Sequence, residues 1–91
     1  MSKNREGYSL EKLRSCIDEI DHELLKLLNE RAKCVIKIGK IKQKEKQNIL
    51  VPMREKELLE CLRKANKGPI SDAMMVYLFQ QIIDVLKELQ K

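Results

Sequence analysis

The chain has 91 residues, the length of one small domain, and its formal net charge is +5. Hydrophobic residues make up 43% of it and charged residues 36%, a balance that excludes a disordered chain and is typical of a helical globular domain. Aromatic residues are only 3% of the chain and tryptophan is absent, which is poor material for stacking nucleic-acid bases. On charge alone, nucleic acid and small carboxylate ligands both fit the basic excess.

The cysteines and the histidine indicate a reducing environment and no metal. Cys16, Cys34 and Cys61 lie in helical patterns without a CxxC spacing, so we interpret them as reduced, packed thiols. The single histidine, His22, makes a zinc site improbable. The first residues, MSKNREGYS, contain no apolar signal segment, and no apolar run reaches membrane-spanning length. We therefore expect a cytoplasmic protein without a membrane partner.

A long first helix is predicted to open the domain. We expect residues 1–8 to be a flexible N-terminus and residues 9–91 to form one helical domain, with Ser9 as the cap of the helix. Its apolar positions alternate in steps of three and four residues, typical of heptad packing. These seam positions are Leu10, Leu13, Ile17, Ile20, Leu24, Leu27, Arg31, Cys34, Ile38 and Ile41. No proline occurs before Pro52, so the helix is predicted to end between residues 44 and 47.

The predicted length of this helix indicates a second chain. About 37 residues at 1.5 Å each give a rod of roughly 55 Å, whereas a compact domain of this size has a radius of gyration near 12 Å. The rest of the chain cannot cover such a rod. We therefore predict an intertwined homodimer, and a monomeric mass at micromolar concentration would contradict it.

Two shorter helices are predicted to follow, which makes the fold class all-α. Residues 47–51 form a connector, and Pro52 suits the first turn of a helix that runs to about residue 66. The NKGP stretch at 66–69 predicts the end of this helix. Ser71 can cap a third helix that continues to the C-terminus. No strand-like alternation is found.

Two cations occupy the apolar seam of the first helix. At 100° per residue, Arg31 and Lys42 point within about 20° of each other and are separated by roughly 16 Å along the axis. Lys42 lies about 40° from Ile38, inside the apolar arc. Four other lysines cluster within about 60° on the opposite, solvent-facing side. They are Lys33, Lys37, Lys40 and Lys44.

A buried cation needs a counter-charge, because leaving it unpaired costs several kcal/mol. Internal acids, such as Glu55, Glu57 or Asp84, are one source; the carboxylates of a ligand are the other, and both remain open at this point. Arg54 carries the wrong sign for the first turn of a helix, which favours a functional role for it.

Several motifs together resemble the all-helical, AroQ-type chorismate mutases. They are LRSCIDEIDHELLKLLNER (13–31), GKIK (39–42), PMREKELLECL (52–62), LFQQIID (78–84) and Gln90. The resemblance spans about residues 9–90 and implies an intertwined homodimer of three-helix chains with shared active sites. It also implies an isomerase of the shikimate pathway that converts chorismate to prephenate for phenylalanine and tyrosine synthesis. No cofactor or metal takes part in that Claisen rearrangement.

The resemblance implies roles for the polar site residues one by one. Arg14 reaches a substrate carboxylate from the second chain, and Arg31 binds a carboxylate within its own chain. Lys42 contacts a carboxylate and the ether oxygen, and Gln90 donates to that oxygen as charge develops. The RE pair completes the set: Arg54 helps to hold the other carboxylate, and Glu55 accepts from the ring hydroxyl.

The remaining site positions implied by the resemblance are apolar. Ile38 and Ile83 are expected to wall the ring. Val51 stands where many relatives have an acidic residue, so only its backbone can reach the hydroxyl, and Leu86 stands where relatives often have serine. Both departures remove a polar side chain from the site.

Two rival functions stay open on the sequence. An isochorismate-pyruvate lyase can share the fold and the pericyclic chemistry, and no residue decides against it. A helical nucleic-acid or protein-binding module would use the exposed lysine face instead. The low aromatic content and the seam position of Lys42 argue against nucleic acid.

Overall fold

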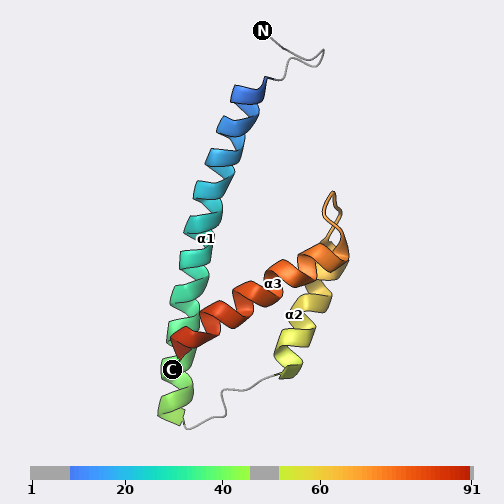
Figure 1. Ribbon diagram of the computed structural model, residues 1–91. Helices are drawn as coiled ribbons and strands as arrows, with labels where there is room; N and C mark the ends of the chain where they lie inside the picture. The colour runs from blue at the N-terminus through green and yellow to red at the C-terminus, as the bar shows by residue number, and fades with distance from the viewer. Residues whose placement is uncertain (1–8, 46–51, 91) are drawn as a thin grey trace. The chain divides into compact units, whose positions relative to one another are not determined.

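The computed structural model describes residues 9–45 and 52–90, and in these ranges it contains helices and no strand. The helices are α1 (Leu10–Glu45), α2 (Pro52–Ala65), α3 (Asp72–Lys87) and a short 3-10 turn, η1 (Glu88–Gln90) (Figure 1). The predicted all-α class, with one very long helix, is confirmed. The N-terminal segment 1–8, the connector and Val51 fall outside the described residues.

The chain divides into two compact units, residues 1–31 and 32–91, and each is described by itself. In the first unit the described part is the beginning of α1, which Ser9 caps as predicted: its hydroxyl accepts a hydrogen bond from the Lys12 amide at 3.2 Å. A single helix cannot bury its own apolar stripe. The stripe is therefore exposed in this chain, along Leu10, Leu13, Ile17, Ile20, Leu24 and Leu27.

In the second unit, α2 and α3 form a helical hairpin around an ordered turn (Figure 1). Gly68 has a φ of 77°, a conformation that glycine adopts without steric cost, and it ends α2 as the sequence predicts. The Asn66 side chain accepts from the Gly68 amide at 3.1 Å and donates to Asp72 Oδ1 at 2.9 Å. Ser71 then caps α3 by accepting from the Met74 amide at 3.1 Å.

The core of the second unit is small. Among the described hydrophobic residues, only Val35 of α1 and Met75 and Ile83 of α3 are buried. The predicted third helix does not run to the C-terminus as one α-helix, because its last turn tightens into η1. None of the described helices is both long enough and apolar enough to cross a bilayer.

Candidate functional site

The cations of α1 separate by exposure as the helical register predicts. The four lysines of the opposite face, Lys33, Lys37, Lys40 and Lys44, are all exposed. Lys42, in the last turn of α1, is half-buried and engaged in an interaction. Exposed lysines lose little hydration, whereas a half-buried cation is held where it can act on a bound group. Lys42 is therefore the lysine of this tract suited to a site.

The C-terminal turn packs directly onto α1 beside Lys42. A Cβ built on Gly39 would lie 2.9 Å from the Cα of Gln90 and 3.1 Å from its carbonyl oxygen. Gly39 is buried and precedes Lys42 by three residues, so the two are neighbours on the helix surface. Gln90, itself half-buried, is thus brought to the level of Lys42 on α1. Two of the predicted catalytic residues therefore lie in the same region.

An ion pair joins α2 to α3 on the same unit. Lys87 Nζ lies 2.5 Å from Glu55 Oε2, and the two side chains are 36% and 28% exposed. The hydrogen bond to Glu55 is the main cause that raises the pKa of Lys87 above its ordinary value of 10.5. Glu55 is one of the internal acids that the sequence offered as a partner for the seam cations. In the structure its partner is Lys87, which is not one of the seam cations.

The apolar positions of the predicted site differ in burial. Ile83 is 5% exposed and belongs to the core of the unit, while Leu86 is half-buried. Ile38 is 43% exposed, so the described residues leave much of its side chain uncovered. Arg54, in the first turn of α2, is exposed.

Arg14 and Arg31 lie on the part of α1 that belongs to the first unit. Arg14 is exposed and Arg31 is half-buried. Within residues 9–45 and 52–90, Arg31 has no ion pair with an acid. A half-buried guanidinium without a protein carboxylate is a suitable group for binding one from a ligand.

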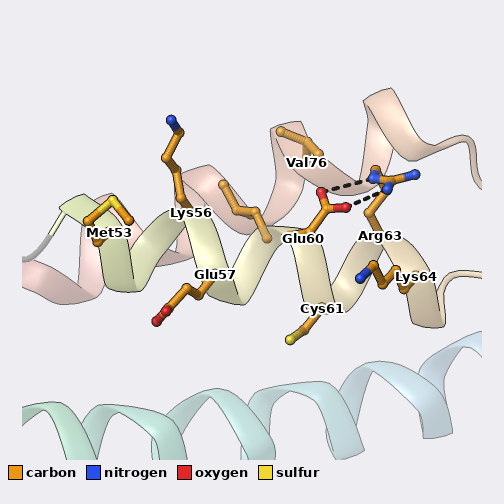
Figure 2. A pocket seen from close by; sticks show the side chains of 9 residues that line it. Met53, Lys56, Glu57, Glu60, Cys61, Arg63, Lys64 and Val76 are labelled. Atoms are coloured by element: carbon orange, nitrogen blue, oxygen red, sulfur yellow. Dashed lines mark hydrogen bonds and ion pairs between the residues drawn. The ribbon is translucent and has the colours of Figure 1, made fainter.

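A separate hollow of about 610 Å³ lies on the surface of α2 and contains none of the predicted site residues (Figure 2). Its rim includes the exposed Met53 and Cys61, and Val76 of α3 contributes to it. Glu60 accepts two hydrogen bonds from Arg63 beside it, at 3.1 and 2.5 Å, and this pairing lowers the pKa of Glu60. The two charges of this pair therefore neutralise each other.

The chemistry of the described groups is that of binding and electrostatic stabilisation. Among the described residues there is no cluster of three or more His, Cys, Asp or Glu that could hold a metal ion. The half-buried groups that point to function are Arg31 in the first unit and Lys42, Glu55 and Gln90 in the second. A cation can hold an anionic group, and a cation or an amide donor can stabilise charge that develops in a bound substrate.

The family is decided by comparison with known sequences. The family model described as "Chorismate mutase type II" matches residues 13–91, most of the chain. The chain belongs to the type II chorismate mutase family. The match extends from the fourth residue of α1 through α2 and α3 to the C-terminal turn that carries Gln90.

Individual relatives agree with the family assignment. The chain is 42% identical over 86 residues to a bifunctional chorismate mutase/prephenate dehydratase of Aquifex aeolicus, covering 90% of this chain but only 24% of that protein. It is 35% identical to a chorismate mutase of Methanocaldococcus jannaschii, covering 90% of this chain and 84% of that one. The shared part is thus most of a small protein in the second relative and about a quarter of a larger protein in the first.

Solved structures show the same fold. A chorismate mutase of Thermus thermophilus (Form II) superposes with a TM-score of 0.87 at 32% identity, over 89% of this chain and 92% of that one. A chorismate mutase of Helicobacter pylori, in complex with prephenate, superposes with a TM-score of 0.81 at 31% identity, over 89% and 88%.

Sequence reasoning missed two residues of this region. Lys87 lies four residues after Ile83 and three before Gln90, so helical register alone places it on their face. Gly39 was named only as part of the GKIK motif. A glycine inside a long helix is destabilising by roughly 0.5–1 kcal/mol relative to alanine, and that cost is the signal that something approaches it closely.

Proposed function

We propose that this chain is a chorismate mutase, an isomerase that rearranges chorismate to prephenate in phenylalanine and tyrosine biosynthesis. Residues 9–91 would form its catalytic domain. The reaction is an intramolecular Claisen rearrangement in which the ether C–O bond breaks as a new C–C bond forms, so no nucleophile, cofactor or metal is required. The observation that carries the proposal is family membership across the helices, supported by half-buried cations at the motif positions.

Binding of the two substrate carboxylates is assigned to arginines. Arg31 holds one of them, and its lack of a protein acid within the described residues supports this role. Arg14 reaches a carboxylate from the second chain, and Arg54 helps to hold the other one. Fixing both carboxylates selects the compact conformer in which the reacting carbons approach each other.

Charge that develops on the ether oxygen is stabilised by Lys42 and Gln90. The packing of the C-terminal turn on Gly39 beside Lys42 supports the pairing of these two roles. A cation and an amide donor positioned before reaction stabilise the transition state more than the ground state, which raises kcat. Glu55 accepts from the ring hydroxyl, and the ion pair from Lys87 holds its carboxylate in place.

The apolar members of the site complete the proposal. Ile38 and Ile83 wall the ring, Leu86 lies beside them, and the Val51 backbone reaches the hydroxyl. The 43% exposure of Ile38 in one chain is consistent with a site finished by a bound substrate or a second copy. A Helicobacter pylori relative bound to prephenate supports this class of ligand.

The proposed assembly is a homodimer with shared active sites, acting in the cytoplasm without a nucleic-acid or membrane partner. The exposed stripe of α1 supports the dimer, because it needs an apolar partner surface. Three free cysteines, Cys16, Cys34 and Cys61, suit a reducing compartment.

The test is to incubate the purified protein with chorismate and follow prephenate formation. We expect turnover in the wild type and a loss of kcat/KM of about 10²-fold or more in Arg31→Ala and Lys42→Ala, since each removes a preorganised charge. Lys40→Ala is the matched control, because Lys40 lies two residues from Lys42 but is exposed on the opposite face.

Two outcomes would contradict the proposal. Absence of prephenate formation by the wild type would reject the activity. Equal losses in Lys40→Ala and Lys42→Ala would show that the separation of the lysines by face has no functional meaning.

A further inference from the structure

We infer that Gly39 is a positioning residue for the reaction: its missing side chain lets the C-terminal turn seat the Gln90 amide beside Lys42. This inference rests on the proposed function. It assigns a role to a residue that neither binds substrate nor carries a functional group. Its basis is the contact between the backbone of α1 and the backbone of η1.

The contact leaves no room for a methyl group. A Cβ at residue 39 would lie 2.9 Å from the Cα of Gln90, 3.1 Å from its carbonyl oxygen and 3.3 Å from its Cβ. The two closest atoms belong to the backbone, so a rotamer change of Gln90 cannot relieve the contact. Carbon atoms prefer separations of about 3.5–4.0 Å, and the turn would therefore have to move by about half an ångström or more.

Gly39 belongs to a buried strip of α1. Val35 precedes Gly39 by four residues, one helical turn, and is 8% exposed. The buried pair Val35 and Gly39 thus forms one strip of α1, and Lys42 follows on the next turn. A shift of η1 away from Gly39 would change the distance between the Gln90 amide and the Lys42 ammonium.

Glycine at this position is otherwise unfavourable. In a helix interior it costs conformational entropy relative to alanine, and α1 continues for six residues beyond Gly39. Substitution by alanine would strengthen α1 itself. The contact with the Gln90 backbone would have to open at the same time, so a positioning role is separated from general damage to the fold by the change in kcat against KM and by local hydrogen exchange.

The experiment compares four proteins: wild type, Gly39→Ala, Gln90→Ala and the double variant. For Gly39→Ala we expect kcat to fall by about 10²-fold, the cost of a small misplacement of a catalytic group, while KM changes by less than about threefold. The double variant should be no slower than Gln90→Ala alone, because both changes remove the same interaction. Lys40→Ala, next to Gly39 but exposed, should keep the wild-type kcat.

Amide hydrogen exchange supplies a readout that does not depend on activity. In Gly39→Ala we expect faster exchange in residues 86–90 with unchanged exchange in α2, since only the seat of η1 is disturbed. Wild-type kcat in Gly39→Ala, or independent multiplicative losses in the double variant, would overturn the inference. If the wild type fails to rearrange chorismate, the proposed function is rejected, and unchanged exchange at 86–90 would separately overturn the seating of η1 on Gly39.

Discussion

Lys87 gives Glu55 an ion-pair partner that the sequence did not suggest. The sequence places Glu55 beside Arg54 at the start of α2 and offers it both as a partner for the seam cations and as a ligand for the ring hydroxyl. In the structure it pairs with Lys87 of α3. One oxygen, Oε2, makes that contact, and a carboxylate has further lone pairs for a hydroxyl donor. The ion pair is therefore compatible with the proposed role and restricts the orientation of the carboxylate.

The ion pair predicts how Lys87→Met will respond to pH. The folded-state pKa of Lys87 is raised above 10.5, so its contribution to stability is complete below the unfolded pKa and is lost as pH rises through the folded pKa. We expect the variant to be less stable than the wild type at pH 8 by under about 1 kcal/mol, since the pair is partly exposed. That difference should vanish at pH values above the raised pKa. Urea unfolding at a fixed protein concentration measures it.

Lys56→Met provides the matched control, because Lys56 is an exposed lysine of α2. Its difference from the wild type should be smaller and should not show this pH dependence. A Lys87→Met difference that is constant between pH 8 and pH 12 would mean that the ion pair does not stabilise the fold.

At the scale of the elements, side-chain caps decide where the helices begin. Ser9 and Ser71 both accept a backbone amide three residues ahead, and both were predicted from the sequence. Pro52 is the first residue of α2, where its missing amide hydrogen costs nothing. Two of the three predicted helix ends also agree with the structure, since α1 ends at Glu45 and α2 at Ala65. The third differs, because α3 gives way to η1 at residue 88.

Removing the cap of α3 gives an element-scale prediction. Ser71→Ala deletes the hydroxyl that accepts from the Met74 amide, and we expect a loss of about 1 kcal/mol in the free energy of unfolding. Ser71→Asp should retain most of the stability, because a carboxylate also caps the amide and favours the helix N-terminus. Urea denaturation of the three proteins at equal concentration measures both values. Equal losses in Ala and Asp variants would show that the side-chain oxygen is not what matters.

At the scale of the whole molecule, the exposed stripe of α1 is the dominant feature. The first unit consists of one described helix whose apolar positions have no cover, with Ile20 58% and Leu24 51% exposed. At about 25 cal/mol per Å², burying such side chains is a large driving force for association. A second copy of the chain is the partner that we propose, since an apolar seam with heptad spacing packs well against itself.

A charge in the stripe is expected to dissociate the proposed dimer. In Ile20→Asp an ionised carboxylate would have to be buried in the interface, at a cost of several kcal/mol. We expect sedimentation to report the monomer mass at a concentration where the wild type is dimeric, together with loss of prephenate formation. Lys26→Asp, on the opposite side of α1 and exposed, should remain dimeric and active. An unchanged mass for Ile20→Asp would contradict an interface along this stripe.

The lysines of α1 show what the spacing of residues along one helix can predict. Helical register separated Lys42 from the exposed lysines, and the structure agrees, since register depends only on the spacing of residues along one helix. The same reasoning placed Arg31 in the seam, and the resemblance added Arg14. The roles of both stay predictions, because they depend on a bound substrate and, for Arg14, on a second chain. The Val51 prediction lies outside the described residues.

The sequence by itself determined the helices, their caps, the apolar faces and the family, because these follow from spacing and from motifs that need no partner. Only the tertiary structure decided which residues of different helices contact each other. The pairing of Glu55 with Lys87 and the seating of Gln90 on Gly39 join residues more than thirty positions apart. Such contacts depend on how α3 and its last turn pack, and no local pattern encodes that packing. Gly39, the one glycine of α1, lies in the structure against the backbone of the residue that carries the proposed catalytic amide.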